Sequence, residues 1–184
     1  MKSDRWAFCA LLACLSLLPM LYPQAAKMLI WQRDLFSQGQ WWRALSAHFI
    51  HIDGRHLLFN LLGLFLVCEL FWDQLDITDA FVLFMMSALG VSILLWLLQP
   101  GLLWYAGLSG VLHGLWAGFA GAGLIRRKSW FFLAALLLLA CKLAWMPDGF
   151  SPLPVIHVAH LYGACSGLLG LVFIRLKQHM LKLD

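Results

Sequence analysis

Charged residues are scarce in this sequence, since Lys, Arg, Asp and Glu together make up only 12% of its 184 residues. A soluble domain of ordinary composition carries about 25% charged residues. Hydrophobic residues account for 62% of the chain, which is more apolar surface than a soluble domain of this length can bury. The composition therefore excludes a soluble protein and predicts an integral membrane protein with a single domain over residues 1–184.

Cysteine is absent from the stretches between the apolar runs, because all five cysteines lie inside those runs. The sequence therefore gives no sign of a disulfide framework. Alternation of polar and apolar residues at the period of a β-strand is also missing, which argues against a membrane barrel. We find no linker, low-complexity tract or internal repeat.

Long apolar runs are what the chain does contain. They cover residues 6–22, 55–72, 79–98, 105–125, 129–146 and 157–175. A helix needs about 20 apolar residues to cross a bilayer, and each run is close to that length. The sequence thus predicts an all-α membrane protein with a bundle of six transmembrane helices.

The positive charges between these runs predict the orientation of the bundle. Lys and Arg occur at the N-terminus, at 126–128 and in the C-terminal tail, whereas the connections 99–104 and 147–156 contain neither. With six spans, the three basic segments lie on one side of the membrane. Because cytoplasmic loops carry the excess of Lys and Arg, we expect both termini in the cytoplasm.

Two parts of the N-terminal region need separate interpretation. The first 26 residues resemble a secretory signal peptide, with a basic start and an apolar centre. Their removal would leave five spans and move the basic tail outside, so we expect them to remain as the first helix. The following loop contains "GQWWRALSAHFIHIDGRH", whose aromatic and amphipathic pattern predicts a segment lying in the outer membrane interface.

Polar side chains gather near the starts of the second, fourth and sixth runs. They are His56 and Asn60, then Ser109, then His157 and His160. These three spans all run from outside to inside, so a rise of about 1.5 Å per residue puts the polar groups at a similar depth. Polar groups in hydrocarbon are costly, and their convergence below the outer surface indicates a functional site.

Glycines recur every three or four residues on two of these spans. They are Gly110, Gly114 and Gly118 in the fourth span, and Gly163, Gly167 and Gly170 in the sixth. Small residues at this spacing let membrane helices approach closely. Because His160 continues the stripe of the sixth span, we expect it within hydrogen-bonding reach of Ser109.

A serine beside a histidine predicts nucleophilic catalysis. Serine is a weak nucleophile until a base takes its proton, and histidine titrates in the appropriate range. Acyl transfer also needs donors for the developing oxyanion, which His56, Asn60 and the backbone near Ser109 could supply. Because Glu69 lies at the far end of the second span, we predict a dyad rather than a triad.

His113 is a rival base, since it lies four residues after Ser109 on the same helical face. It is one turn deeper, where water and a peptide reach less easily, so we favour His160. His113 could instead pack under His160, bind a water, tune the base, or only fill space and bond to a neighbouring helix.

Four short motifs, in order, resemble the rhomboid family of intramembrane serine proteases. "GLSGVLHG" resembles the family's GxSG motif, "AHLYGACSG" its sixth-helix motif, "HLLFN" its HxxxN motif, and "WWR" its first-loop Trp-Arg pair. The resemblance implies a six-helix fold with Ser109 as nucleophile. It selects His160 over His157 as base and assigns oxyanion stabilisation to His56 and Asn60.

His113 stands where many bacterial rhomboids have an aromatic residue, and the chain resembles the rhombosortase subfamily. That resemblance implies cleavage of C-terminal tails of exported bacterial proteins, which carry a Gly-Gly motif, an apolar helix and a basic end. It also implies a multi-pass protein of the bacterial cytoplasmic (inner) membrane, in contact with lipids and membrane-tethered substrates. No cofactor, metal or nucleic acid is expected.

Other functions have less support from the sequence. Two HxxH pairs, His48/His51 and His157/His160, would suit a metal or haem protein, but the chain has no HExxH motif. Haem would also prefer histidines facing each other at mid-membrane. A catalytically inactive rhomboid-like binder or chaperone is a further alternative, although such proteins usually lack the serine or the histidine.

Overall fold

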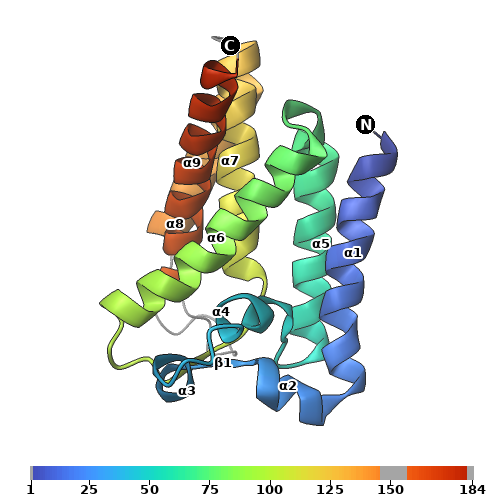
Figure 1. Ribbon diagram of the computed structural model, residues 1–184. Helices are drawn as coiled ribbons and strands as arrows, with labels where there is room; N and C mark the ends of the chain where they lie inside the picture. The colour runs from blue at the N-terminus through green and yellow to red at the C-terminus, as the bar shows by residue number, and fades with distance from the viewer. Residues whose placement is uncertain (1, 146–156, 182–184) are drawn as a thin grey trace.

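The computed structural model describes residues 2–145 and 157–181, which form a helical bundle with one short strand pair. The long helices are α1 (Lys2–Leu21), α5 (Gly54–Phe71), α6 (Ile77–Leu98), α7 (Ser109–Arg127), α8 (Trp130–Ala144) and α9 (His157–Met180). The start of α1 and the end of α9 lie at the same end of the bundle (Figure 1). The connection predicted over 147–156 falls outside the described residues.

Within the described residues, four helical segments are long and apolar enough to cross a membrane. They are Asp4–Leu21, Gly54–Gln74, Ile77–Leu98 and His157–Met180. Helix α8 is also apolar but shorter, at 15 residues. Six spans with cytoplasmic termini therefore stay a prediction.

Two predicted helix boundaries are wrong. The run at 105–125 does not begin as a helix, because Trp104–Tyr105 forms β2, which pairs antiparallel with β1 (Trp31–Gln32). Helix α7 starts only at Ser109, which is its first residue. The run at 157–175 is shorter than the helix that contains it, because α9 continues to Met180. A charged side chain can end an apolar run without ending the helix.

The end of the bundle opposite the termini is closed by short elements between α1 and α5. They are α2 (Pro23–Leu29), β1, α3 (Arg33–Ser37), α4 (Arg43–Ser46) and the 3₁₀ helix η1 (Ala47–Phe49) (Figure 1). Arg43, of the predicted Trp-Arg pair, is buried and donates to Gln40 Oε1 over 2.8 Å and to the Ile30 carbonyl. Trp42 is 55% exposed, whereas Ala47 is fully buried, so this segment has the two faces that its amphipathic pattern predicts.

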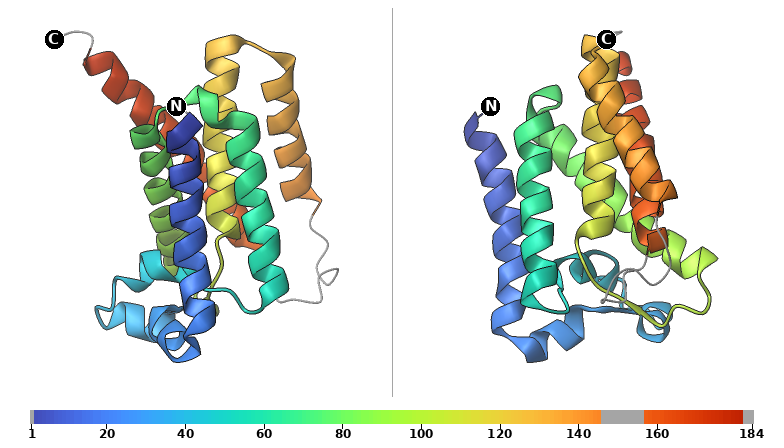
Figure 2. Two further views of the ribbon diagram at one scale, coloured as in Figure 1. Left: turned by 90° about the vertical axis from the view of Figure 1, so that its right-hand side faces the viewer. Right: turned by 180° about the vertical axis from the view of Figure 1, so that it is seen from behind.

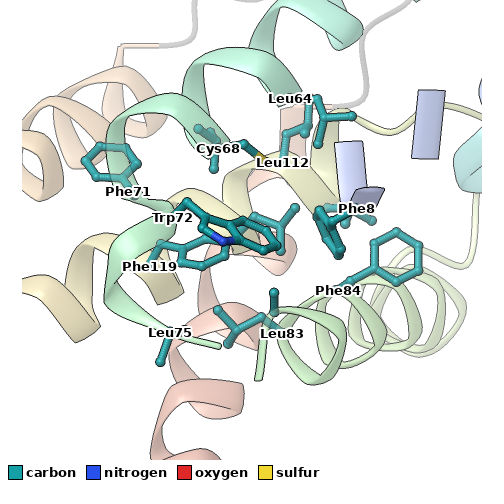
Figure 3. Packing of buried hydrophobic residues seen from close by; sticks show 14 of the residues in the cluster. Phe8, Leu64, Cys68, Phe71, Trp72, Leu75, Leu83, Phe84, Leu112 and Phe119 are labelled. Atoms are coloured by element: carbon teal, nitrogen blue, oxygen red, sulfur yellow. The ribbon is translucent and has the colours of Figure 1, made fainter. Parts of the chain in front are cut away.

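Aromatic side chains hold the first helix in the bundle. Trp72, in η2 (Trp72–Gln74), lies between Phe8 of α1 and Phe119 of α7 (Figure 3). Its ring centroid is 5.3 Å from that of Phe8 and 5.9 Å from that of Phe119. All three rings are at most 3% exposed, and aromatic side chains of this kind dominate the energetics of a core.

Helices α7 and α9 lie side by side along much of their length (Figures 1 and 2). The glycine pattern predicted this, and the contact is confirmed. A Cβ at Gly163 would overlap the carbonyl oxygen of Gly110, and one at Gly167 would overlap that of Gly114. Gly170 differs, because it faces the side chains of α6 instead. The two backbones are thus in direct contact beside Ser109 and His160.

Candidate active site

Ser109 owes its position to the turn that precedes α7. After β2 the chain turns at Gly107, whose φ is +128°, a region that side chains with a Cβ rarely adopt. A Cβ there would also lie 2.8 Å from His56 Cε1. Ser109 then opens the helix, and the N-cap residue Leu108 makes no side-chain capping bond.

Three hydrogen bonds fix this turn to the rest of the fold. The Gly107 N–H donates to the Ala47 carbonyl over 3.1 Å. The Gly107 carbonyl accepts from the Tyr105 hydroxyl at 2.9 Å and lies 3.4 Å from His48 Nδ1. Burial raises the pKa of Tyr105, so its hydroxyl keeps the proton that it donates.

His48 connects this turn to helix α6. The residue is completely buried, and its Nε2 lies 2.9 Å from the Ala88 carbonyl and 3.2 Å from Ser92 Oγ. Burial lowers the pKa of His48 to about 4, so the ring is neutral at neutral pH. The structure therefore uses His48 as a structural link, a role that its HxxH spacing did not indicate.

The Ser109 hydroxyl contacts His160 across the α7–α9 interface. Ser109 Oγ lies 2.9 Å from His160 Nε2, although the residues are 51 positions apart. His160 is 5% exposed, and its other ring nitrogen, Nδ1, has no partner among the described residues. The pair thus has the geometry of a serine nucleophile with its base. Within the described chain, no carboxylate contacts His160 to orient its ring.

His113 lies directly beside His160. The two rings are stacked, with centroids 4.2 Å apart and planes at 11°. His113 Nδ1 lies 2.7 Å from the backbone carbonyl of Ser109, and its Nε2 lies 2.6 Å from Nζ of Lys142. Neither ring nitrogen of His113 is bonded to the Ser109 hydroxyl, so this geometry favours His160 as the base.

Lys142, on α8, is the member of this group that sequence reasoning missed. It is the single charged residue in the fifth apolar run, 129–146. A lone charge inside an apolar helix was the available signal, because such residues usually face a partner or a cavity. Its partner, 29 positions earlier in the chain, could not be read from spacing.

The predicted oxyanion residues lie at the start of α5. Asp53 caps this helix by accepting the His56 N–H over 2.8 Å, a bond that lowers the pKa of the Asp53 carboxyl. Asn60 Nδ2 donates to the His56 carbonyl at 3.0 Å, and His56 Nδ1 has no partner among the described residues. His56, Asn60 and Gly63 all line one cavity.

That cavity has a volume of about 860 Å³ and is lined by residues of α5, α7, α8 and α9. Helix α7 stands between α5 and α8 (Figure 2), and side chains of all three helices line the cavity. Ser109, His160 and His113 are in its wall, which is otherwise mostly apolar. The cavity therefore offers an apolar surface beside the serine.

The remaining histidines do not form a shared metal site in the described chain. His157 contacts His160, with centroids 6.1 Å apart, and His51 contacts His56 at 5.0 Å. Burial, together with the neighbouring His56, lowers the pKa of His51 to about 4. Among the described residues, no group of three or more His, Cys, Asp or Glu could hold a metal ion.

Comparison with known proteins points to one family. The family model "Rhomboid domain" matches residues 38–177. The chain is also 24% identical over 138 residues to "Putative rhomboid protease YdcA" of Bacillus subtilis (strain 168), an alignment covering 72% of this chain and 67% of that protein. The match with the family model includes every residue of the site described above.

Proposed function

This chain belongs to the rhomboid family, and we propose that it is an intramembrane serine protease with Ser109 as nucleophile and His160 as base. It is a multi-pass membrane protein, and membrane protease activity is the function that its family suggests. The observation that carries the proposal is the 2.9 Å contact between Ser109 Oγ and His160 Nε2. This distance lies within hydrogen-bonding reach, as nucleophile activation requires.

The reaction proceeds in two halves. As Ser109 Oγ bonds to the scissile carbonyl carbon, its proton passes to His160 Nε2. The resulting imidazolium gives that proton to the leaving nitrogen, the C–N bond breaks, and an ester remains on Ser109. Water then attacks the ester, with His160 again accepting and returning a proton. Attack by another nucleophile in place of water would instead give a sortase-like acyl transfer.

Negative charge on the former carbonyl oxygen requires donors in both halves. His56 and Asn60 line the cavity that Ser109 also lines, and the backbone N–H groups that begin α7 are free of intrahelical partners. Each donor of an oxyanion hole is worth roughly 10²–10³ in rate. We assign His56, Asn60 and these N–H groups to this role.

The substrate class follows from the resemblance to rhombosortases. We propose that the enzyme cleaves C-terminal tails of exported bacterial proteins, each with a Gly-Gly motif, an apolar helix and a basic end. The apolar helix would enter the cavity between α5 and α8, where the wall is mostly apolar. We further propose that the single domain 1–184 lies in the bacterial inner membrane, with six spans, cytoplasmic termini and cleavage near the outer face.

A reporter protein ending in such a tail tests this proposal. Wild-type protein, co-expressed with the reporter in bacterial membranes, should shorten it near the Gly-Gly motif, and Ser109→Ala should leave it intact. Equal cleavage by Ser109→Ala would end the assignment of the nucleophile. A reporter with its two glycines changed to leucine tests the substrate class separately, and equal cleavage of that reporter would contradict it.

A further inference from the structure

Lys142 is the one charged residue of α8, a helix that otherwise consists of apolar side chains. Charged residues inside membrane helices are expensive and mark functional positions, typically with an identifiable partner. The ammonium Nζ of Lys142 lies 2.6 Å from Nε2 of His113. In the structure this partner is a histidine ring rather than a carboxylate.

The contacts of His113 with Lys142 and with the Ser109 carbonyl agree on where its proton lies. A lysine ammonium has three donors and no acceptor, so the nitrogen facing it must accept. Nε2 of His113 is therefore unprotonated and Nδ1 carries the hydrogen, which donates to the Ser109 carbonyl at 2.7 Å. Both nitrogens are occupied, so His113 cannot take the proton of the Ser109 hydroxyl.

The same contacts fix the plane of the ring. His113 is held at one nitrogen by its own helix and at the other by α8, and its face lies against His160 at a centroid distance of 4.2 Å. Rotation of the His113 ring would remove the flat surface on which His160 rests. Reacting groups must be held close to their productive geometry, and a displacement of about 1 Å can cost about 10²-fold in rate.

We propose that Lys142 is a positioning residue that acts through His113: by holding Nε2 from α8 it fixes the plane of that ring, and thereby aims His160 Nε2 at Ser109. The proposal rests on the protease function argued above. It also explains why two neighbouring histidines do not compete for the serine proton, because Lys142 occupies the one nitrogen of His113 that could accept it.

A competing role for Lys142 is direct binding of an acidic group on the substrate. Lys142 lines the cavity together with Arg55, and no Asp or Glu is among the described residues of the lining. Substrate binding by Lys142 would change KM, whereas positioning of the base changes kcat. The two roles can therefore be separated by kinetics on purified full-length protein.

The test measures kcat and KM for a purified tail substrate with Lys142→Met, Lys142→Gln and the control Leu137→Met, which lies on the same helix but outside the cavity lining. We expect Lys142→Met to lower kcat about tenfold or more with little change in KM. Lys142→Gln, whose amide can still donate to Nε2, should recover most of that loss. Leu137→Met should match wild type.

A double-mutant cycle supplies a readout that a merely structural lysine would not give. If Lys142 acts through His113, adding Lys142→Met to His113→Phe should cause no further loss of kcat, because coupled residues are not additive. Additive losses, a wild-type kcat in Lys142→Met, or a change in KM alone would each overturn the proposal. If Lys142→Met does not fold, Lys142→Leu replaces it.

Ser109→Ala is measured in the same series to keep the two hypotheses apart. Activity in Ser109→Ala would refute the protease mechanism itself. An inactive Ser109→Ala, together with a fully active Lys142→Met, would refute only the role of Lys142.

Discussion

The imidazole of His113 lies parallel to that of His160, with ring centroids 4.2 Å apart and an angle of 11° between the planes. His160 reaches the Ser109 hydroxyl, whereas His113 is bonded to a backbone carbonyl and to Lys142. One ring is thus placed to exchange a proton, and the other supports it.

Substitutions at the two histidines should therefore have unequal effects. We expect His160→Ala to abolish cleavage, because Ser109 loses its base. His113→Ala should retain part of the activity, and His113→Phe, which keeps a flat ring under His160, should retain more. Initial cleavage rates of a tethered substrate check this order, and an active His160→Ala beside an inactive His113→Ala would reverse the roles.

A single methyl group added between α7 and α9 should destabilise the fold, because the two helices are in close contact. Gly163→Ala would push a Cβ into the carbonyl oxygen of Gly110, a backbone atom that cannot move alone. Overpacking of this kind costs typically about 1–3 kcal/mol of unfolding free energy. Unfolding measured in detergent should show this loss.

Gly101→Ala is the matched control for that measurement, because a Cβ at Gly101 meets nothing within 4 Å. It should unfold like the wild type. Equal stability of Gly163→Ala and Gly101→Ala would contradict the described helix contact.

Gly107→Ala should impair both folding and catalysis. Its positive φ strains any residue with a Cβ, and that Cβ would also lie 2.8 Å from His56 Cε1. Gly39→Ala isolates the strain, since Gly39 has a φ of +94° with open space around its Cβ. We expect both variants to unfold more easily, and only Gly107→Ala to show a lower kcat; a wild-type kcat there would refute the contact with His56.

Acid should destabilise the fold through His48. The pKa of its imidazole is about 4 in the folded protein and about 6.5 in an unfolded chain, so the unfolded state binds more protons between these limits. The contribution of neutral His48 to the free energy of unfolding is complete above about pH 6.5 and is lost as the pH falls toward 4. By pH 5 the loss is about 2 kcal/mol.

Unfolding temperatures measured between pH 7.5 and pH 5 check this sign. The wild type should lose stability over this range, and His48→Gln should be less stable at pH 7.5 but less dependent on pH. A steeper pH dependence in His48→Gln would disagree with a neutral, buried His48. His51, with a similarly lowered pKa, contributes in the same direction and is present in both proteins.

Much of the arrangement could be predicted because it depends on the spacing of glycines and polar residues along single helices. The glycine spacing predicted the contact of α7 with α9, and the positions of the polar residues in three spans predicted that those residues lie close together. These patterns depend only on the helical repeat, which a single sequence displays.

Features that depend on long-range partners could not be predicted. Tyr105 is the first residue of the apolar run 105–125, yet its backbone pairs with Trp31, 74 positions earlier. Lys142 and His48 similarly acquire their roles from partners on other helices. Periodicity indicates on which face of its helix a residue lies, but it does not indicate which atom of another helix that residue contacts.

Labelling of the purified protein with a serine-reactive fluorophosphonate tests the central claim most directly. Peptide mass spectrometry should find the adduct on Ser109, with no adduct in Ser109→Ala, a rate near zero in His160→Ala and a reduced but measurable rate in His113→Ala. An adduct on a different residue, or labelling of His160→Ala at the wild-type rate, would contradict activation of Ser109 by His160.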